Sequence, residues 1–357
     1  MSLIAFRFQA AAAPTTSSIA ATTRSTVRLR TRGKERLGDA SGTRRMLTRP
    51  RAQNLGVPAT IFELPLAGPA GEPVDLWRTL VSQGLADLPP SSVDEERRRL
   101  VTTIAVPGQR PRTLRLSQGA SGQAVVEVLG APLGARGRER VAAVLRRMLN
   151  LDEDLSAFYA VAATDPALSW ATAGAGRMLH SQTVFEDVVK TICTTNCAWS
   201  ATVRMVTALV EQLGEPSAGG HGRAFPTPAT MATASEGFYR DVVRAGYRGA
   251  YLRSLAAGVV DGTIELESLR SASPDELTDE EVAARLLALP GVGPYAAAQV
   301  MMLLGRHSRL ILDSWTRPKW AKVNGRKAAD ATIERHFRRY GRYAGLAFWL
   351  RVTEDWA

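Results

Sequence analysis

Two glycines, a proline and an aspartate in the last fifth of the chain have types and a spacing that suit phosphate binding and carboxylate chemistry. Gly291 and Gly293 allow a tight turn that a ligand can approach closely, and Pro294 suits the first position of a helix. The N-terminus of such a helix presents unpaired N–H groups, which bind phosphate. Asp313 follows Tyr295 by eighteen residues. The pattern therefore predicts an anion site with a carboxylate shortly after it.

Two helices must position these residues. Residues 279–289 predict a helix with an apolar side, and a second helix starts at Pro294. Helix, glycine-rich hairpin, helix and carboxylate together resemble the helix-hairpin-helix (HhH-GPD) DNA glycosylase superfamily, with the hairpin at 279–300. The resemblance implies that the hairpin grips a DNA phosphate and that Asp313 drives base excision. It assigns backbone binding within the hairpin to Gly291, Val292, Gly293 and Tyr295.

Further segments resemble one branch of that superfamily, the 3-methyladenine DNA glycosylase II and 8-oxoguanine DNA glycosylase group. Ile192–Asn196 resembles a segment whose Asn enters the duplex where the base has left, and Ala245–Leu252 also resembles that branch. The resemblance spans about residues 60–357 and is strongest over 183–313. It implies that void filling and the lesion pocket involve Asn196, Trp199, Tyr247, Tyr251, Gln299 and Phe348.

Ordinary structural roles also fit several of these residues. Asn196 suits a helix-terminal or loop-capping amide, and most of the aromatic side chains suit a core. Tyr295 either stacks on a flipped base or packs. Asp313 precedes Ser-Trp-Thr, where an Asp can cap a helix, and capping is compatible with catalysis.

Position 295 bears on the mechanism. In the bifunctional branch of the family a Lys at this position attacks the sugar and forms a Schiff base, whereas Tyr295 carries no amine. The resemblance therefore implies a monofunctional glycosylase that uses water and leaves an intact abasic site. Lys190, Lys319 and Lys322 are other amines of the chain, but none stands at the family position.

The expected reaction is hydrolysis of an N-glycosidic bond after the nucleotide has been extruded from the duplex. The sugar develops oxocarbenium character, as in O-glycoside hydrolysis, and Asp313 would stabilise it and orient the water. Aromatic side chains suit cationic alkylated purines. We therefore expect a base-excision-repair enzyme for alkylated purines. The alternatives are an 8-oxoguanine glycosylase, with or without abasic-site lyase activity, and a non-catalytic module that binds damaged DNA.

Damaged double-stranded DNA is the expected partner, and the protein is expected to be a monomer. Cations after Asp313 are expected to contact phosphates, chiefly Arg317 and Lys319, with Lys322, Arg326 and Lys327 as further candidates. No cofactor or metal is expected, although this hairpin in the family can hold a structural monovalent cation through backbone carbonyls. The only two cysteines, Cys193 and Cys197, cannot build the four-cysteine iron–sulfur cluster of some relatives.

The net charge of +11 is unevenly distributed along the 357 residues. Residues 1–55 carry +9, residues 56–289 carry −5, and residues 290–357 carry +7. The positive charge of the folded part therefore gathers around and after the hairpin, as expected of a DNA-binding surface. Residues 1–55 are rich in Ala, Ser, Thr and Arg and predict a disordered basic tail.

Localisation depends on how that tail is interpreted. A bacterial cytoplasmic protein on the chromosome is the expected case, and a later start at Met46 would fit it. An organellar or nuclear protein is expected if the tail is a transit peptide. No segment has the length and apolarity of a membrane span, and two cysteines argue against a disulfide scaffold.

The predicted fold class is α+β. Alternating, β-rich stretches predict strands within 56–135, namely Ala59–Leu64, Leu100–Val106, Arg112–Leu116 and Ala124–Leu129. This block is similar to the small antiparallel N-terminal domain of the same branch. Residues 136–357 predict a helical domain, with one helix running from Thr183 through Cys197 and another over Ala201–Leu213.

Overall fold

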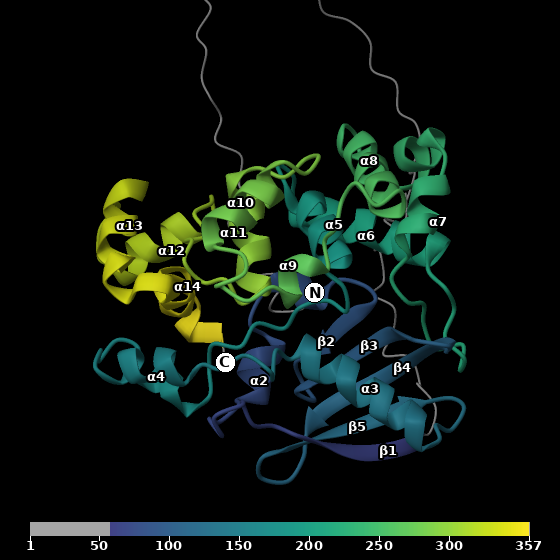
Figure 1. Ribbon diagram of the computed structural model, residues 1–357, viewed down its shortest axis with the longest axis horizontal. Helices are drawn as coiled ribbons and strands as arrows, with labels where there is room; N and C mark the ends of the chain where they lie inside the picture. The colour runs from purple at the N-terminus through teal and green to yellow at the C-terminus, as the bar shows by residue number, and fades with distance from the viewer. Residues whose placement is uncertain (1–57, 357) are drawn as a thin grey trace, which may run out of the picture.

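The computed structural model describes residues 58–356 (Figure 1). The prediction for residues 1–55 lies outside these residues. An antiparallel five-stranded sheet, in the order β1-β5-β4-β3-β2, forms one end of the described part. Its strands are β1 (Pro58–Pro65), β2 (Ser91–Asp94), β3 (Arg99–Val106), β4 (Gln109–Gln118) and β5 (Gln123–Leu129).

The four strands predicted from the sequence are confirmed as β1, β3, β4 and β5; three are slightly longer than predicted, and β4 extends by several residues. The sequence prediction missed β2, because Ser91–Asp94 is short and has no apolar alternation of its own. Pairing with β3 creates this strand: Ser91 lies opposite Thr102, and their hydroxyl oxygens are 2.8 Å apart. The strand is thus a product of tertiary context rather than of local propensity.

The remaining elements are helical and follow the sheet in the sequence, apart from two short ones between β1 and β2. The α-helices are α2 (Leu76–Leu80), α3 (Ala135–Met148), α4 (Ser156–Ala163), α5 (Val184–Thr194), α6 (Trp199–Leu213), α7 (Pro228–Thr233), α8 (Arg248–Val260), α9 (Ser268–Ser271), α10 (Asp279–Leu287), α11 (Pro294–Leu303), α12 (Thr316–Val323), α13 (Asp330–Phe337) and α14 (Ala344–Thr353). Single 3-10 turns are η1 (Gly84–Asp87), η2 (Ser169–Ala173), η4 (Arg338–Tyr343) and η5 (Glu354–Trp356), and η3 (Phe238–Val242) is a π-helical turn. The predicted α+β class is confirmed.

Helix α3 packs on the sheet and completes its core. Its apolar stripe, which includes Val141, Val144 and Leu145, shares one cluster of buried residues with Leu114 and Val126 of the sheet. Figure 1 shows α3 lying across the strands. The core of the N-terminal domain therefore extends past residue 135, where the sequence pattern changes from strand to helix.

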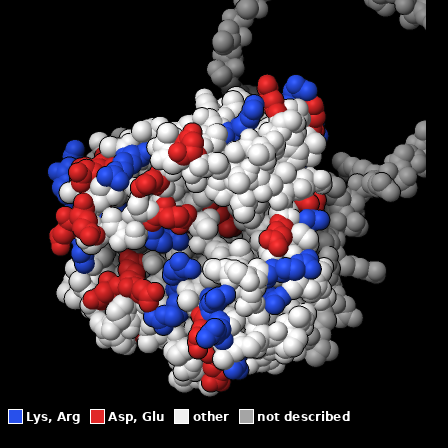
Figure 2. All heavy atoms as spheres, turned by 45° about the vertical axis from the view of Figure 1, so that its right-hand side comes forward, with Lys and Arg blue, Asp and Glu red and all other residues white. Residues whose placement is uncertain are grey.

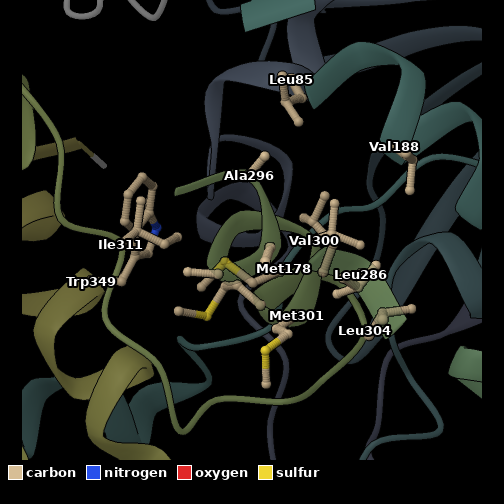
Figure 3. Close-up of a cluster of buried hydrophobic side chains, with 14 of the residues drawn as sticks. Leu85, Met178, Val188, Leu286, Ala296, Val300, Met301, Leu304, Ile311 and Trp349 are labelled. Carbon is tan, nitrogen blue, oxygen red and sulfur yellow. The ribbon is translucent and has the colours of Figure 1, made fainter. Parts of the chain in front are cut away.

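The second core surrounds α11, the helix after the hairpin. Every residue of α11 from Ala296 to Leu303 is buried, as expected of a helix that is apolar on all sides. Figure 3 shows Ala296 and Val300 surrounded by side chains from other elements, including Leu85, Val188 and Trp349. Since α11 is enclosed by the core, its N-terminal end has a fixed position in the molecule.

Helix α5 ends earlier than the sequence suggests. Thr183 caps its start by accepting a hydrogen bond from the Glu186 amide, but the last helical residue is Thr194. Asn196 has a positive φ of 45°, a conformation that Asn tolerates better than most residues and that breaks a helix. The predicted continuation through Cys197 is therefore wrong, and the next helix begins at Trp199 rather than Ala201.

None of the helices within residues 58–356 has the length and apolar character needed to span a bilayer.

Candidate active site

The turn between α10 and α11 forms the hairpin that the sequence predicted. Gly291 has φ +78°, in the left-handed region that favours glycine, and Gly293 is the N-cap of α11. Pro294 occupies the first turn, and no side chain caps this end of the helix. Val292 is buried and anchors the turn to the core. The arrangement leaves helix-terminal amides available for an anion.

We expect Gly291→Ala and Gly293→Ala to separate the shape of the hairpin from its ligand contact. An alanine Cβ at position 291 would lie 2.7 Å from the Tyr251 ring, and the alanine would be held in a strained backbone conformation. The free energy of unfolding of Gly291→Ala should therefore fall by about 2 kcal/mol. Gly293 has φ −101°, and no atom lies within 4 Å of the position of its Cβ. Gly293→Ala should therefore keep the wild-type free energy of unfolding, measured with urea. It should lose affinity for duplex DNA, measured by titration. Equal stabilities of the two variants would contradict this explanation.

Asp313 has one oxygen engaged and one free. Its Oδ1 accepts hydrogen bonds from the Trp315 amide at 2.9 Å, the Thr316 amide at 2.6 Å and the Thr316 hydroxyl at 3.0 Å. No residue in the described range donates to Oδ2. The carboxylate therefore organises the start of α12 with one oxygen and leaves the other for a ligand. The N-cap of α12 is Trp315, so Asp313 stabilises the helix start from two residues before it. Its catalytic role stays a prediction.

Four contacts made by Arg306 and His307 anchor the loop from α11 to Asp313. Arg306 is buried and donates to Asp279 Oδ1 at 3.2 Å and to the Ala272 carbonyl at 2.7 Å. The next residue, His307, has its Nε2 2.6 Å from Glu153 Oε1. Its carbonyl accepts a hydrogen bond from the Gly345 amide at 2.7 Å. These contacts with separate elements fix the path of the chain to Asp313.

Asp313 faces a pocket of about 100 Å³ between the two domains. Four residues that the sequence predicted for the site line it: Trp199, Tyr295, Gln299 and Asp313. The N-terminal domain contributes Gly84 and Leu85 from η1, and the helical domain adds Thr194, Cys197, Trp315 and Trp349. The pocket is therefore rich in tryptophan, and its polar groups are the Asp313 carboxylate, the buried Gln299 amide, the Tyr295 phenol, the Cys197 thiol and the hydroxyls of Thr194, Thr202 and Ser314.

Tyr295 stands in the pocket as a neutral phenol. Its hydroxyl lies 3.4 Å from the Thr194 hydroxyl. Burial, together with the negative charge of Asp313, raises the pKa of Tyr295 to about 12. The side chain therefore stays protonated in the physiological pH range and does not act there as a base. As a phenol it also has no amine that could act as a nucleophile.

Three residues expected in the void or lesion pocket instead form an exposed rim beside the hairpin. Asn196 Nδ2 donates to the Tyr247 hydroxyl at 3.4 Å, and the rings of Tyr247 and Tyr251 are 5.9 Å apart, edge to face. Tyr247 is 54% exposed and Tyr251 39% exposed, and Tyr251 packs against Gly291. They do not line the pocket. Their assignment to void filling stays a prediction.

Phe348 does not line the pocket in this structure, and its role at the lesion stays a prediction. Phe348 is fully buried, and its ring packs on Trp320 and Phe337 at 6.2 and 5.3 Å. Its neighbour Trp349 lines the pocket instead, because consecutive residues of α14 point to different sides. No sequence signal separates the two, because α14 is buried on nearly all sides and the neighbouring helices decide which residue faces the pocket.

The two cations favoured for phosphate binding are paired with carboxylates. Arg317 donates to both oxygens of Asp330 at 2.8 Å, and Lys319 Nζ lies 3.0 and 3.2 Å from the oxygens of Asp355. On the face drawn in Figure 2, basic and acidic side chains lie next to one another rather than forming a wholly basic surface. Lys322, Arg326 and Lys327 are exposed and form no ion pair with a described residue.

Within residues 58–356, no group of three or more His, Cys, Asp or Glu side chains is arranged to hold a metal ion. Cys193 is buried, and the Cys197 thiol donates to the Cys193 carbonyl at 3.2 Å. Both cysteines therefore have structural surroundings, although Cys197 also reaches the pocket. A monovalent cation at the hairpin stays a prediction.

Comparisons with known proteins bear on the fold. No family model matches the sequence, and no curated protein matches it. Solved structures do match: MBOgg1 in complex with a low-affinity DNA ligand has a TM-score of 0.63 and 17% identity over 85% of this chain and 98% of that chain. The 3-methyladenine DNA glycosylase from Archaeoglobus fulgidus has a TM-score of 0.62 and 21% identity, covering 83% of this chain and 98% of its own.

An 8-oxoguanine glycosylase/lyase from Clostridium acetobutylicum, in its apo form, has a TM-score of 0.57 and 20% identity over 76% of this chain and 92% of that chain. The matches thus include proteins from both groups that the sequence resembles. At these sequence identities, the structural matches show a common fold. The chain has the fold of the helix-hairpin-helix DNA glycosylases.

Proposed function

We propose that this protein is a DNA glycosylase of base excision repair, which extrudes a damaged base and hydrolyses its N-glycosidic bond. The observation that carries the proposal is the Asp313 carboxylate, which has one oxygen fixed by the start of α12 and the other free in an aromatic pocket. A module that only binds DNA needs no such carboxylate. The fold shared with known glycosylases supports the same conclusion.

The geometry of the site supports the following reaction. Amides at the N-terminus of α11 hold a phosphate of the strained strand, beside the pocket that Tyr295 and Asp313 line. As the glycosidic bond breaks, the sugar becomes cationic, and the negative charge of Asp313 stabilises it. The free Oδ2 is the atom that can orient and deprotonate water.

We infer that water, rather than a lysine, is the nucleophile. No lysine in the described range lines the pocket. Lys190 is buried with its Nζ 2.8 Å from Glu186 Oε1, and Lys319 is paired with Asp355. Tyr295, at the family's lysine position, is a phenol. A monofunctional mechanism is the one that these residues support.

For the substrate we propose alkylated purines. Trp199, Trp315 and Trp349 surround the pocket with π-systems, which attract cationic bases. Gln299 is buried in the lining, and its amide can hydrogen-bond to one edge of the base. The 8-oxoguanine alternative rests on the same pocket, since Gln299 could also bind a neutral oxidised purine.

We expect single-turnover assays on duplexes with one defined lesion to show excision of 3-methyladenine in preference to 8-oxoguanine. The panel also contains hypoxanthine, ethenoadenine and uracil, and each product is examined before and after hot alkali. Strand breaks should appear only after alkali, and borohydride should trap no covalent complex. A trapped complex would show that an amine takes part, and excision of 8-oxoguanine alone would establish the alternative substrate. Binding of lesion duplexes without any excision would establish the non-catalytic module.

A further inference from the structure

A second and larger cavity adjoins the active-site pocket. It is a groove of about 500 Å³ between α11, α12, α13 and η4. Tyr295 lines both the groove and the pocket, so its ring lies between the space around Asp313 and this second space. This volume is within the range of small-ligand sites and is larger than a phosphate ion alone would fill. A ligand of nucleotide size fits such a groove.

The charged groups of the groove favour an anionic ligand. Three arginines line it, Arg309, Arg317 and Arg338, against two acids, Asp330 and Glu334. Since Asp330 holds Arg317 through both oxygens, that pair has little free charge. Arg309 and Arg338 are exposed and form no ion pair with any residue between 58 and 356. Two guanidinium groups are therefore available to a phosphate.

The rest of the lining suits the other parts of a nucleotide. Pro294 and Tyr295 bring the N-terminal end of α11 to the groove, where the helix dipole favours negative charge. Leu310 and Leu312 provide apolar surface for a sugar or base. Both belong to the loop that leads to Asp313, so the groove and the catalytic carboxylate are joined by a few residues of one segment.

We propose that this groove binds the nucleotide that flanks the flipped one in the damaged strand, with Arg309 and Arg338 contacting its phosphate. The inference rests on the proposed function, because the shared wall at Tyr295 makes the occupant of the groove a neighbour of the nucleotide beside Asp313. It also moves the phosphate contacts from the ion-paired Arg317 and Lys319 to the unpaired Arg309 and Arg338.

A phosphate scan tests the proposal without requiring excision. The probe is a set of duplexes with a tetrahydrofuran abasic-site analogue and one neutral methylphosphonate, placed in turn at each position flanking the analogue. One replacement should weaken the binding of the wild type about tenfold, the loss expected for a charge-assisted contact. The same replacement should change the binding of Arg309→Ala/Arg338→Ala by less than about twofold, because the contact is already absent.

The matched control is Arg136→Ala/Arg335→Ala. It removes the same charge from exposed arginines on α3 and α13 that line neither cavity. This control should keep the tenfold sensitivity to the methylphosphonate. It should also keep the salt slope of binding, whereas the groove variant should have a slope reduced by about one unit per lost phosphate contact.

Other outcomes identify which idea fails. If excision rates are normal and the methylphosphonate lowers the duplex affinity of the wild type and the groove variant equally, the proposed role of the groove is overturned and the proposed glycosylase function stands. A protein that binds no duplex and excises no lesion overturns both. Binding of free dAMP that requires Arg309 and Arg338, without any coupling to the phosphate scan, would make the groove a site for free nucleotides and overturn the proposed DNA contact.

Discussion

Asp313→Asn is expected to lower the single-turnover excision rate by about 10³-fold while changing duplex affinity by less than about twofold. The change removes the negative charge that stabilises the cationic sugar and the base that activates water. The hairpin amides and the pocket walls, which hold the DNA, are unchanged. Measurement of excision and of binding to an abasic-site analogue, on the same preparations, separates the two effects.

The geometry of Asp313 makes this variant informative. An Asn can keep a carbonyl oxygen at the position of Oδ1, so the hydrogen bonds from Trp315 and Thr316 that start α12 can persist. Only the free oxygen is exchanged for an NH₂ group. The expected loss is therefore chemical rather than structural, and the thermal unfolding midpoint should shift little.

Asp75→Asn is the matched control for the change of Asp to Asn at a helix start. Asp75 caps α2 by accepting a hydrogen bond from the Arg78 amide at 2.9 Å, and it lies outside the pocket. This variant should excise at the wild-type rate. If Asp313→Asn also excised within about threefold of wild type, the carboxylate would not be part of the reaction, and the case for catalysis at this site would fall.

The hairpin and the carboxylate could be predicted because their signals are local. Gly291 needs a positive φ, Pro294 suits the first turn of α11, and Asp313 accepts hydrogen bonds from amides two and three residues after it. The long strands could also be predicted, since apolar and polar residues alternate along each of them. Such features depend on neighbouring residues and on little else.

The pocket lining could be predicted only in part, because it depends on how distant segments pack. Leu85 reaches the pocket from the N-terminal domain, and no pattern around it indicates this. Trp349 and Phe348 differ only in which side of α14 faces the pocket, and the neighbouring helices decide that. Tyr247 and Tyr251 carry a family resemblance, but their exposure beside the hairpin follows from the docking of α8.

The ion pairs of Arg317 and Lys319 could not be predicted from the sequence either. The net +7 of residues 290–357 suggested a free basic surface. In the structure, Asp330 neutralises Arg317 across thirteen positions, and Asp355 neutralises Lys319 across thirty-six. Charge counting gives the sign of a region, but only the fold tells which cations remain available to phosphate.

Arg177→Met is expected to lower the free energy of unfolding by about 3–5 kcal/mol, the range for a buried ion pair that loses one partner. The Arg177 side chain is 0% exposed, and its Nη2 lies 2.7 Å from Oε1 of Glu72, which is 5% exposed. Arg177 also donates to the carbonyls of Asn150 and Glu153. Its removal leaves a buried carboxylate and two half-buried carbonyls without this donor, and urea unfolding at neutral pH measures the loss of stability.

The control for that loss is Arg240→Met, which breaks a pair on the surface. Arg240 Nη2 lies 2.8 Å from Asp241 Oδ2, but the side chains are 70% and 62% exposed. Water solvates both groups after the change, so the free energy of unfolding should stay close to the wild-type value. Similar losses in both variants would mean that burial does not govern the strength of the Arg177 pair.

The pH dependence identifies the charge of Glu72 as the cause. Burial raises the pKa of Glu72, but hydrogen bonds from backbone amides and the Arg177 guanidinium outweigh it, so the pKa is lowered from 4.5. A lowered carboxyl pKa contributes stability that is present above the unfolded pKa and is lost as the pH falls through the folded one. In Arg177→Met the backbone hydrogen bonds to Glu72 remain but the cation is lost, so the pKa of Glu72 should rise relative to the wild type, and protonation then relieves the buried charge. The gap in stability between wild type and variant should therefore be widest at neutral pH and narrow below about pH 5. A gap that stays constant with pH would instead assign the loss to packing around the vacated guanidinium.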